Sequence, residues 1–251
     1  MGSKKFKNKT CVYCGKENAS STGDHVFARE FFLEGQRANL PQVPACQSCN
    51  NKKSELEHYL TTVLPFGGQH ADSGENLSLM VPKRLNKNRP LHEKLRFEMK
   101  RGWFETASGL VIESTVIPID FRRLEMLLIY IVRGLCWEHL CVQLMNDDFV
   151  KVLALTKVGE KYFDDHFFKA KVKNRIEKTL GNGTIYYEGV QDIDNPKVTA
   201  WRIKWYGGIQ FAGDNNYPNM RTSIFGAVTA NKHDIKDMAR SYLDQISIAI
   251  R

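Results

Sequence analysis

The hydrophobic positions of this chain follow two periods, one typical of helices and one typical of strands. Helical spacing runs from Asn50 to Val63 and near Lys232–Ile246. Residues 121–145 are apolar around much of the circumference, as expected for a helix buried against a sheet. Shorter apolar runs predict strands at Trp103–Glu105, Leu110–Ile117, Thr184–Gly189, Thr199–Trp205, Gly208–Phe211 and Ser223–Val228. This mixture predicts an α+β fold with a long buried helix and antiparallel strands.

The same patterns divide the chain into four parts. Residues 1–10 are polar and lysine-rich and are expected to form a flexible basic arm. Residues 11–66 hold two close cysteine pairs and end in a helical pattern, so they predict one small module. Residues 67–101 are rich in Gly, Asn, Pro and basic residues with little periodicity, which predicts a basic surface connector. Residues 102–251 form the α+β domain, to which the sequence assigns no role.

The composition narrows the class of protein. A chain of 251 residues that is 42% hydrophobic and 25% charged can bury a compact core. No signal peptide is expected, because the lysines at 4, 5, 7 and 9 precede polar residues rather than an apolar stretch. The longest apolar run, Met126 to Val132, is far shorter than the roughly 20 residues that span a bilayer. We therefore expect a soluble, cytoplasmic protein with no membrane partner.

The positive charge is concentrated in the first part of the chain. Residues 1–70 carry nine Lys or Arg against six Asp or Glu, and residues 83–101 carry eight against two. Residues 102–251 are nearly balanced, with nineteen against eighteen. A basic patch favours a polyanionic partner such as nucleic acid, because phosphate neutralisation releases counterions. For charge alone, a solvated surface is the better explanation.

The cysteine spacing predicts a metal site. Two pairs, Cys11-x-x-Cys14 and Cys46-x-x-Cys49, stand 31 residues apart. A two-residue gap lets one tight turn present both sulfurs to one ion, and four thiolates complete a tetrahedral zinc site. Such a closed site leaves no position for water or substrate, so the zinc is expected to be structural. The polar residues between the pairs must carry any chemistry.

The polar residues within this cysteine frame and directly after it stand in a recognisable order. Asp24-His25 is followed by Asn39, by a Val-Pro-Ala segment that runs into Cys46, and by Asn50 directly after Cys49. This order over residues 11–60 resembles the HNH endonuclease family, in the bacterial standalone form with a zinc-stapled ββα-metal module. A weaker similarity to the C-terminal domain that often accompanies this form covers residues 131–135 and 201–207. Ala28 departs from the family, many of whose members have proline there.

The resemblance implies a role for each of these residues. His25 would be the general base, and Asp24 and Asn50 would bind a catalytic Mg²⁺ or Mn²⁺, although the neighbouring Asn51 is an alternative ligand to Asn50. Asn39 would hold the loop and orient the His25 ring. Phosphodiester hydrolysis needs a deprotonated water and positive charge at the reacting phosphate, which these groups would supply. The expected nucleic-acid contacts are Arg29, Lys53, Lys83, Arg84, Lys87 and Arg89.

The resemblance predicts a metal-dependent endonuclease that acts most simply on DNA. It also implies a setting in phage defence or a mobile element, with a companion regulatory or defence protein as a partner. The alternative is a non-catalytic zinc-ribbon module that binds nucleic acid or protein, in which Asp24 and His25 serve only the structure.

Overall fold

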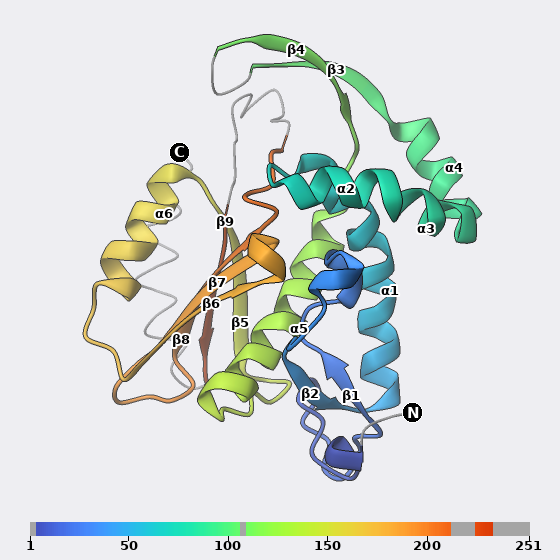
Figure 1. Cartoon of the computed structure of the whole chain (residues 1–251). Coiled ribbons are helices and arrows are strands. Elements are labelled where there is room, and N and C mark those ends of the chain that lie inside the picture. Colours follow the sequence, from blue (N-terminus) through green and yellow to red (C-terminus); the bar gives the residue numbers. More distant parts are fainter. Residues whose placement is uncertain (1–3, 106–108, 212–223, 233–251) are drawn as a thin grey trace.

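The computed structural model of the chain describes residues 4–105, 109–211 and 224–232 (Figure 1). Helices and antiparallel sheets are both present, so the predicted α+β class is confirmed at that level. The helices are α1 Gln47–Val63, α2 Ala71–Leu79, α3 Val81–Lys87, α4 Arg89–Glu98, α5 Phe121–Leu140 and α6 Lys157–Phe163. The strands are β1 Thr22–His25, β2 Gln42–Ala45, β3 Lys100–Glu105, β4 Val111–Val116, β5 Phe149–Leu155, β6 Asn174–Leu180, β7 Ile185–Gln191, β8 Thr199–Trp205 and β9 Ile224–Ala230.

The N-terminal part is a strand pair followed by a helix. β1 and β2 pair antiparallel, and only Cys46 separates β2 from α1. Cys46 caps α1, because its sulfur accepts a hydrogen bond from the backbone N–H of Cys49. The predicted helix Asn50–Val63 is therefore confirmed, with three further residues at its start.

The segment 67–101 differs from the expected irregular connector, because it folds into α2, α3 and α4. Its prolines do not interrupt these helices. Pro82 and Pro90 lie in the first turns of α3 and α4, where a backbone N–H has no intrahelical partner and its loss costs nothing. Asn88 caps α4 by accepting from the N–H of Leu91. Local polar composition therefore concealed a helical segment.

The C-terminal part is built on α5 and a five-stranded antiparallel sheet of order β5-β9-β8-β7-β6. The predicted strands at 184–189, 199–205 and 223–228 correspond to β7, β8 and β9, and those at 103–105 and 110–117 to β3 and β4. Residues 208–211 form no strand; Ile209 makes only an isolated bridge to Gly68. The expected helix near Lys232–Ile246 lies almost entirely outside the described residues, as do Met1 to Ser3 of the predicted N-terminal arm. The rest of that arm is not free, because Lys4–Phe6 forms a short helix, η1, and Phe6 is buried.

Helix α5 ends five residues before the predicted boundary. Cys141 adopts a left-handed conformation (φ 55°), and the N–H of Val142 bonds to the carbonyl of Cys136, which closes the helix. The chain then turns back toward the N-terminal part, where Gln143 donates to the carbonyl of Val12 at 3.0 Å. Apolar composition continues to residue 145, so the sequence alone did not mark this end.

One hydrophobic core joins the two ends of the chain. Helix α5 lies between the sheet and α1 (Figure 1), and α6 covers the other face of the sheet with its own small cluster. Phe27 and Phe31, which follow β1, pack against Trp205 of β8 with ring centroids 6.1 and 5.8 Å apart. The boundary predicted between residues 11–66 and 102–251 is therefore no boundary in packing. Among the described helices, none combines the length and apolar character needed to cross a membrane.

Candidate active site

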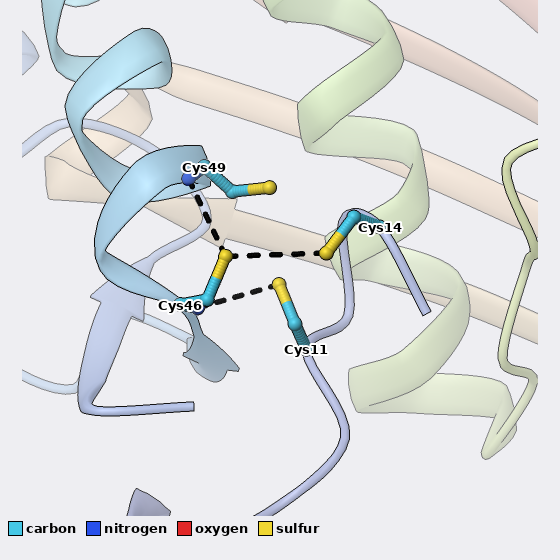
Figure 2. A group of neighbouring side chains, drawn as sticks. All are labelled: Cys11, Cys14, Cys46 and Cys49. Carbon is cyan, nitrogen blue, oxygen red and sulfur yellow. Dashed lines mark hydrogen bonds between the residues drawn. The ribbon is translucent and has the colours of Figure 1, made fainter. Parts of the chain in front are cut away.

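The four cysteines of the predicted zinc site lie together. Figure 2 shows Cys11 and Cys14 from the N-terminal loop facing Cys46 and Cys49 at the start of α1. All four sulfur atoms lie within 4.8 Å of one another, and those of Cys14 and Cys46 are 3.9 Å apart. Thiolates bound to one zinc ion at about 2.3 Å stand about 3.8 Å apart in a tetrahedron. The cluster could therefore hold a structural metal ion such as zinc.

The backbone around the cluster fits a thiolate site as well. The N–H of Cys46 points to the sulfur of Cys11 at 3.3 Å, and the N–H of Cys49 points to that of Cys46 at 3.5 Å. Gly15 follows Cys14 with φ 70°, a left-handed conformation that glycine adopts without strain. N–H groups directed at sulfur stabilise the deprotonated form that binds metal. The four cysteines, predicted from their spacing to share one metal ion, thus lie in a geometry that suits such an ion.

Helix α5 supports this loop through a residue that sequence reasoning missed. The buried guanidinium of Arg133 donates to the carbonyl of Tyr13, between the first two cysteines, at 2.6 Å, and to that of Met145 at 3.2 Å. An arginine inside an otherwise apolar helical stretch was the available signal, because a buried charge needs specific partners. Arg133 fixes the cysteine loop to the C-terminal part.

Asp24 and His25 end β1, and their pairing places them beside β2. His25 faces Gln42 across the strand pair, and the side-chain nitrogen of Gln42 lies 2.7 Å from Nε2 of His25. In this orientation the amide donates, and the ring proton resides on Nδ1. If the Gln42 amide is rotated by 180°, its oxygen faces His25 instead. That oxygen accepts from Nε2–H, so the proton resides on Nε2 and Nδ1 is free to act as a base. Gln42 thus orients the ring, a role that the sequence had suggested for Asn39.

Asn39 lies in the loop before β2, exposed and left-handed with φ 55°. Asparagine is one of the residues that tolerate this conformation, so Asn39 shapes the loop. No hydrogen bond joins it to His25 within the described part of the chain. Its predicted place in the loop is confirmed, whereas its contact with the imidazole is not observed.

His25 is half-buried, and burial is the main reason that its pKa is lowered from the ordinary value. The carboxylate of Asp24 opposes this shift, while the nearby positive charges of Arg29 and Lys53 add to it. A lowered pKa keeps the imidazole neutral at neutral pH, which is the form that accepts a proton. His25 therefore has the protonation state that a general base requires.

Asp24 belongs to a buried polar network. Its Oδ2 accepts from the hydroxyl of Tyr13 at 2.5 Å and lies 3.0 Å from the ammonium of Lys53. The same ammonium pairs with Glu57 one turn along α1 and donates to the carbonyl of His25 at 2.7 Å. Tyr13, Lys53 and Glu57 thus hold the end of β1 against α1.

The expected phosphate contact by Lys53 does not fit this arrangement, because its side chain is fully buried. Burial alone would lower the pKa of Lys53, but the two carboxylates outweigh it and raise that pKa, so the ammonium stays charged. For the carboxyl group of Glu57, burial has the opposite effect and raises the pKa to about 7, although the charge of Lys53 acts to lower it. Spacing along a helix could not reveal that this cation points inward.

Helix geometry distinguishes the two asparagines that follow Cys49. At about 100° per residue, Asn50 lies roughly 60° from Lys53 around α1, whereas Asn51 lies roughly 160° away. Since Lys53 contacts β1, Asn50 is on the side of the helix that faces Asp24 and His25. Asn51 is exposed and accepts from the side chain of Gln47 at 2.7 Å. The arrangement favours Asn50 as the residue nearer the candidate site.

Some of the predicted nucleic-acid contacts are exposed, whereas others are hydrogen-bonded within the protein. Arg29 lies exposed on the short helix η2 (Arg29–Phe31), and Lys83, Lys87 and Arg89 are exposed on α3 and α4. Arg84 instead donates to the carbonyls of Thr61 and Glu30, at 2.6 and 2.5 Å, and to Asn76. Its guanidinium fastens α3 to the segment that follows His25, so it is not free to bind phosphate.

A site for the catalytic divalent ion has less support than the cysteine cluster. Across the described ranges, the four cysteines are the one group of three or more His, Cys, Asp or Glu side chains arranged to hold a metal. An ion beside Asp24 would have one carboxylate and the amide of Asn50 as protein ligands, with water and phosphate oxygens completing its shell. Magnesium sites with few protein ligands have this composition.

Comparison with models of protein families, with curated proteins and with solved structures finds no match to this chain. The function is therefore inferred from the geometry of the site itself.

Proposed function

We propose that the chain is a metal-dependent endonuclease of the HNH type, which hydrolyses phosphodiester bonds, with DNA as the expected substrate. One observation carries this proposal: a half-buried, neutral His25 ends a strand beside Asp24, opposite the first turn of the helix that the cysteine cluster anchors. A ribbon that only staples a fold needs no neutral imidazole at that point.

In the proposed reaction, His25 accepts a proton from a water molecule, whose oxygen attacks the phosphorus. The bond from phosphorus to the leaving oxygen breaks, and that oxygen takes a proton from solvent. With its amide oxygen turned toward Nε2–H, Gln42 leaves Nδ1 of His25 free to accept that proton, and Lys53 fixes the strand end through the carbonyl of His25. A divalent ion held by Asp24 and Asn50 would stabilise the negative charge that develops on the phosphate.

A second function has an observation in its favour. Asp24 is buried and paired with Lys53 and Tyr13, as expected if its role is structural. The chain would then be a zinc-ribbon module that binds nucleic acid or protein without cutting. The setting in phage defence or a mobile element, and the companion protein, stay predictions from the family resemblance.

Nicking of supercoiled plasmid DNA with Mg²⁺ or Mn²⁺ separates the two functions. His25→Ala should lower the rate by about 10²- to 10⁴-fold, because the proton acceptor is lost. Zinc content and duplex affinity should stay unchanged. His58→Ala is the matched control, since His58 is an exposed histidine on α1, outside the candidate site. A His25→Ala chain that nicks at the wild-type rate would refute the proposed mechanism.

Two further variants test the metal ligands. Asn50→Ala should regain activity at higher Mn²⁺ concentration, because one neutral ligand is missing, whereas His25→Ala should not. Asp24→Asn keeps an acceptor for Tyr13 and removes the charge that would bind the ion. If neither variant changes the dependence of the rate on metal concentration, the ion is held elsewhere.

A further inference from the structure

Strands β3 and β4 form a hairpin that stands apart from the rest of the molecule. Figure 1 shows it arching from α4 across the top of the view, separate from the five-stranded sheet below. In the part of the chain that the structure describes, β3 pairs only with β4, through six residue pairs from Lys100↔Val116 to Glu105↔Val111. A two-stranded hairpin is marginally stable by itself. A contact with a partner outside the core would stabilise this separate hairpin.

The hairpin and the helix before it expose large apolar side chains. Phe97 on α4 is 90% exposed, and Trp103 on β3 is 72% exposed. On β4, Val111 and Ile112 are 63% and 48% exposed. Side chains of this size are normally buried, and a group of them at the surface marks an interaction site.

Both faces of the hairpin carry such side chains. Side chains alternate between faces along a strand, and directly paired residues share a face. Trp103 and Val111 therefore lie on one face with Arg101, whereas Ile112 and Lys100 lie on the other. A flat partner surface would cover only one face. A groove, whose two walls enclose the ribbon, would cover both.

The charge around the hairpin indicates the partner's chemistry. Among the described residues, five exposed cations on α3, α4 and β3 have no ion pair: Lys83, Lys87, Arg89, Arg96 and Lys100. Lys94 and Arg101 pair only loosely with Glu98 and Glu113, at 4.0 and 3.8 Å in exposed positions. Exposed ion pairs of this kind contribute little to stability, so these two cations can also bind phosphate. The surface is therefore complementary to a polyanion.

We propose that the protruding hairpin of β3 and β4 enters a groove of a DNA duplex, while the cations of α3, α4 and β3 bind phosphates beside it. The major groove of B-DNA, about 12 Å wide, admits a two-stranded ribbon. Apolar side chains inserted among bases add to the binding, and the phosphates flank the groove on both sides. A duplex thus offers both surfaces that the hairpin and its neighbours require.

Helix α3, which carries part of this cationic surface, is bonded to the segment that follows the candidate active site. Arg84 on α3 is bonded to the carbonyl of Glu30, next to the exposed Arg29 and five residues after His25. The cationic helices are thus tied to the chain that leaves β1. This inference rests on the proposed nuclease function for its substrate, but duplex binding can be measured without cleavage.

Fluorescence anisotropy of a short labelled DNA duplex, without added Mg²⁺ or Mn²⁺, tests the proposal. Lys87→Glu with Arg89→Glu should weaken binding by about tenfold or more and flatten the dependence of affinity on salt, because phosphate contacts are lost. Trp103→Ala should weaken binding by about 5-fold or more and leave the salt dependence unchanged, as expected for a contact with bases. Lys171→Glu with Lys173→Glu is the charge-matched control on exposed lysines next to β6, and should bind like the wild type.

A second readout follows the tryptophan directly. Trp103 is highly exposed, whereas Trp201 and Trp205 are fully buried, so acrylamide quenching reports chiefly on Trp103 and the half-buried Trp137. Added duplex should protect the emission from acrylamide, and Trp103→Phe should abolish that protection.

Two results would overturn the proposal. One is a Trp103→Ala chain that binds duplex as tightly as the wild type. The other is self-association of the wild type, measured by sedimentation, that Trp103→Ala abolishes, because the hairpin would then join two copies. A protein that binds duplex through the hairpin but never cuts would refute only the nuclease function. A protein that cuts DNA but whose altered hairpin leaves duplex affinity unchanged would refute only this inference.

Discussion

The N-terminal strand–strand–helix unit and the C-terminal sheet obtain their shapes by different means. In the N-terminal unit, four cysteines and a short polar network hold β1, β2 and α1 in place. In the sheet, alternating apolar residues of β7 and β8 build the core, with Tyr187, Ile203 and Trp205 buried on one face. The first kind of region supplies the chemistry of the candidate site, and the second supplies most of the buried apolar surface.

The two regions nevertheless depend on each other. A unit of about 60 residues buries too little surface to be robust alone, and such units commonly use a metal. Here the N-terminal unit also packs against the five-stranded sheet, because Phe27 contacts both Tyr187 and Trp205. Arg133 of α5 further fixes the cysteine loop. The candidate site is thus local in sequence but supported by residues more than 100 positions away.

Removal of the metal should have the largest effect on the stability of the N-terminal unit and on its packing against the sheet. We expect one zinc per chain in the purified protein, and Cys46→Ser should lose it. Zinc contributes about 10–16 kcal/mol to small zinc units, which matches or exceeds the total stability of a typical domain. Because Trp205 packs against the N-terminal unit, zinc loss should also shift its fluorescence. Cys141→Ser is the control, since Cys141 is exposed and outside the cluster. Elemental analysis that finds no zinc in fresh protein would contradict this prediction.

The sequence predicted those features that depend on local spacing. The cysteine pairs come together as expected, and the helix expected from Asn50 to Val63 is present. Each follows from a few residues at fixed intervals. The long helix and strands β7 and β8 were also predictable, because their apolar periodicity is strong.

Features that depend on partners distant in the chain were not predictable. Lys53 resembles a surface cation in sequence and becomes a buried one only because Asp24 and Glu57 surround it. Gln42 becomes a partner of His25 only through strand register. Strand β6 is an edge strand with mostly exposed side chains, so it has no apolar alternation to detect.

A core substitution can measure how far the N-terminal unit relies on the sheet. Trp205→Ala should lower the free energy of unfolding by about 3–5 kcal/mol, as for other large buried aromatics. It should also speed zinc release to a chelator, because the support of Phe27 and Phe31 is lost. Phe163→Ala is the matched control, since Phe163 is equally buried but lies in the cluster on the other face of the sheet. Equal zinc release from both variants would mean that the cysteine unit is stable without the sheet.

The smallest expected effect concerns the pH dependence of cleavage, which belongs to the N-terminal unit alone. Burial lowers the pKa of His25 from its ordinary value of 6.5, and the charge of Arg29 adds to that shift. A general base acts when unprotonated, so kcat at saturating DNA and Mn²⁺ should fall only below pH 6.5, as protons bind His25. The fall should approach tenfold per pH unit. The unfolding midpoint, measured at the same pH values, separates this effect from loss of the shared core.

Arg29→Gln sharpens the test, because removing a neighbouring positive charge makes protonation of His25 easier and raises its pKa. The acid limb of kcat should then move to higher pH, toward the ordinary value. Lys52→Gln is the control, since Lys52 is exposed on α1 and is not among the charges that chiefly shift the pKa of His25. Measuring kcat at saturating DNA excludes a weaker affinity as the cause. A limb that does not move would mean that a group other than His25 titrates. A rate that rises as the pH falls would mean that His25 is not the general base, because protonation removes its capacity to accept a proton.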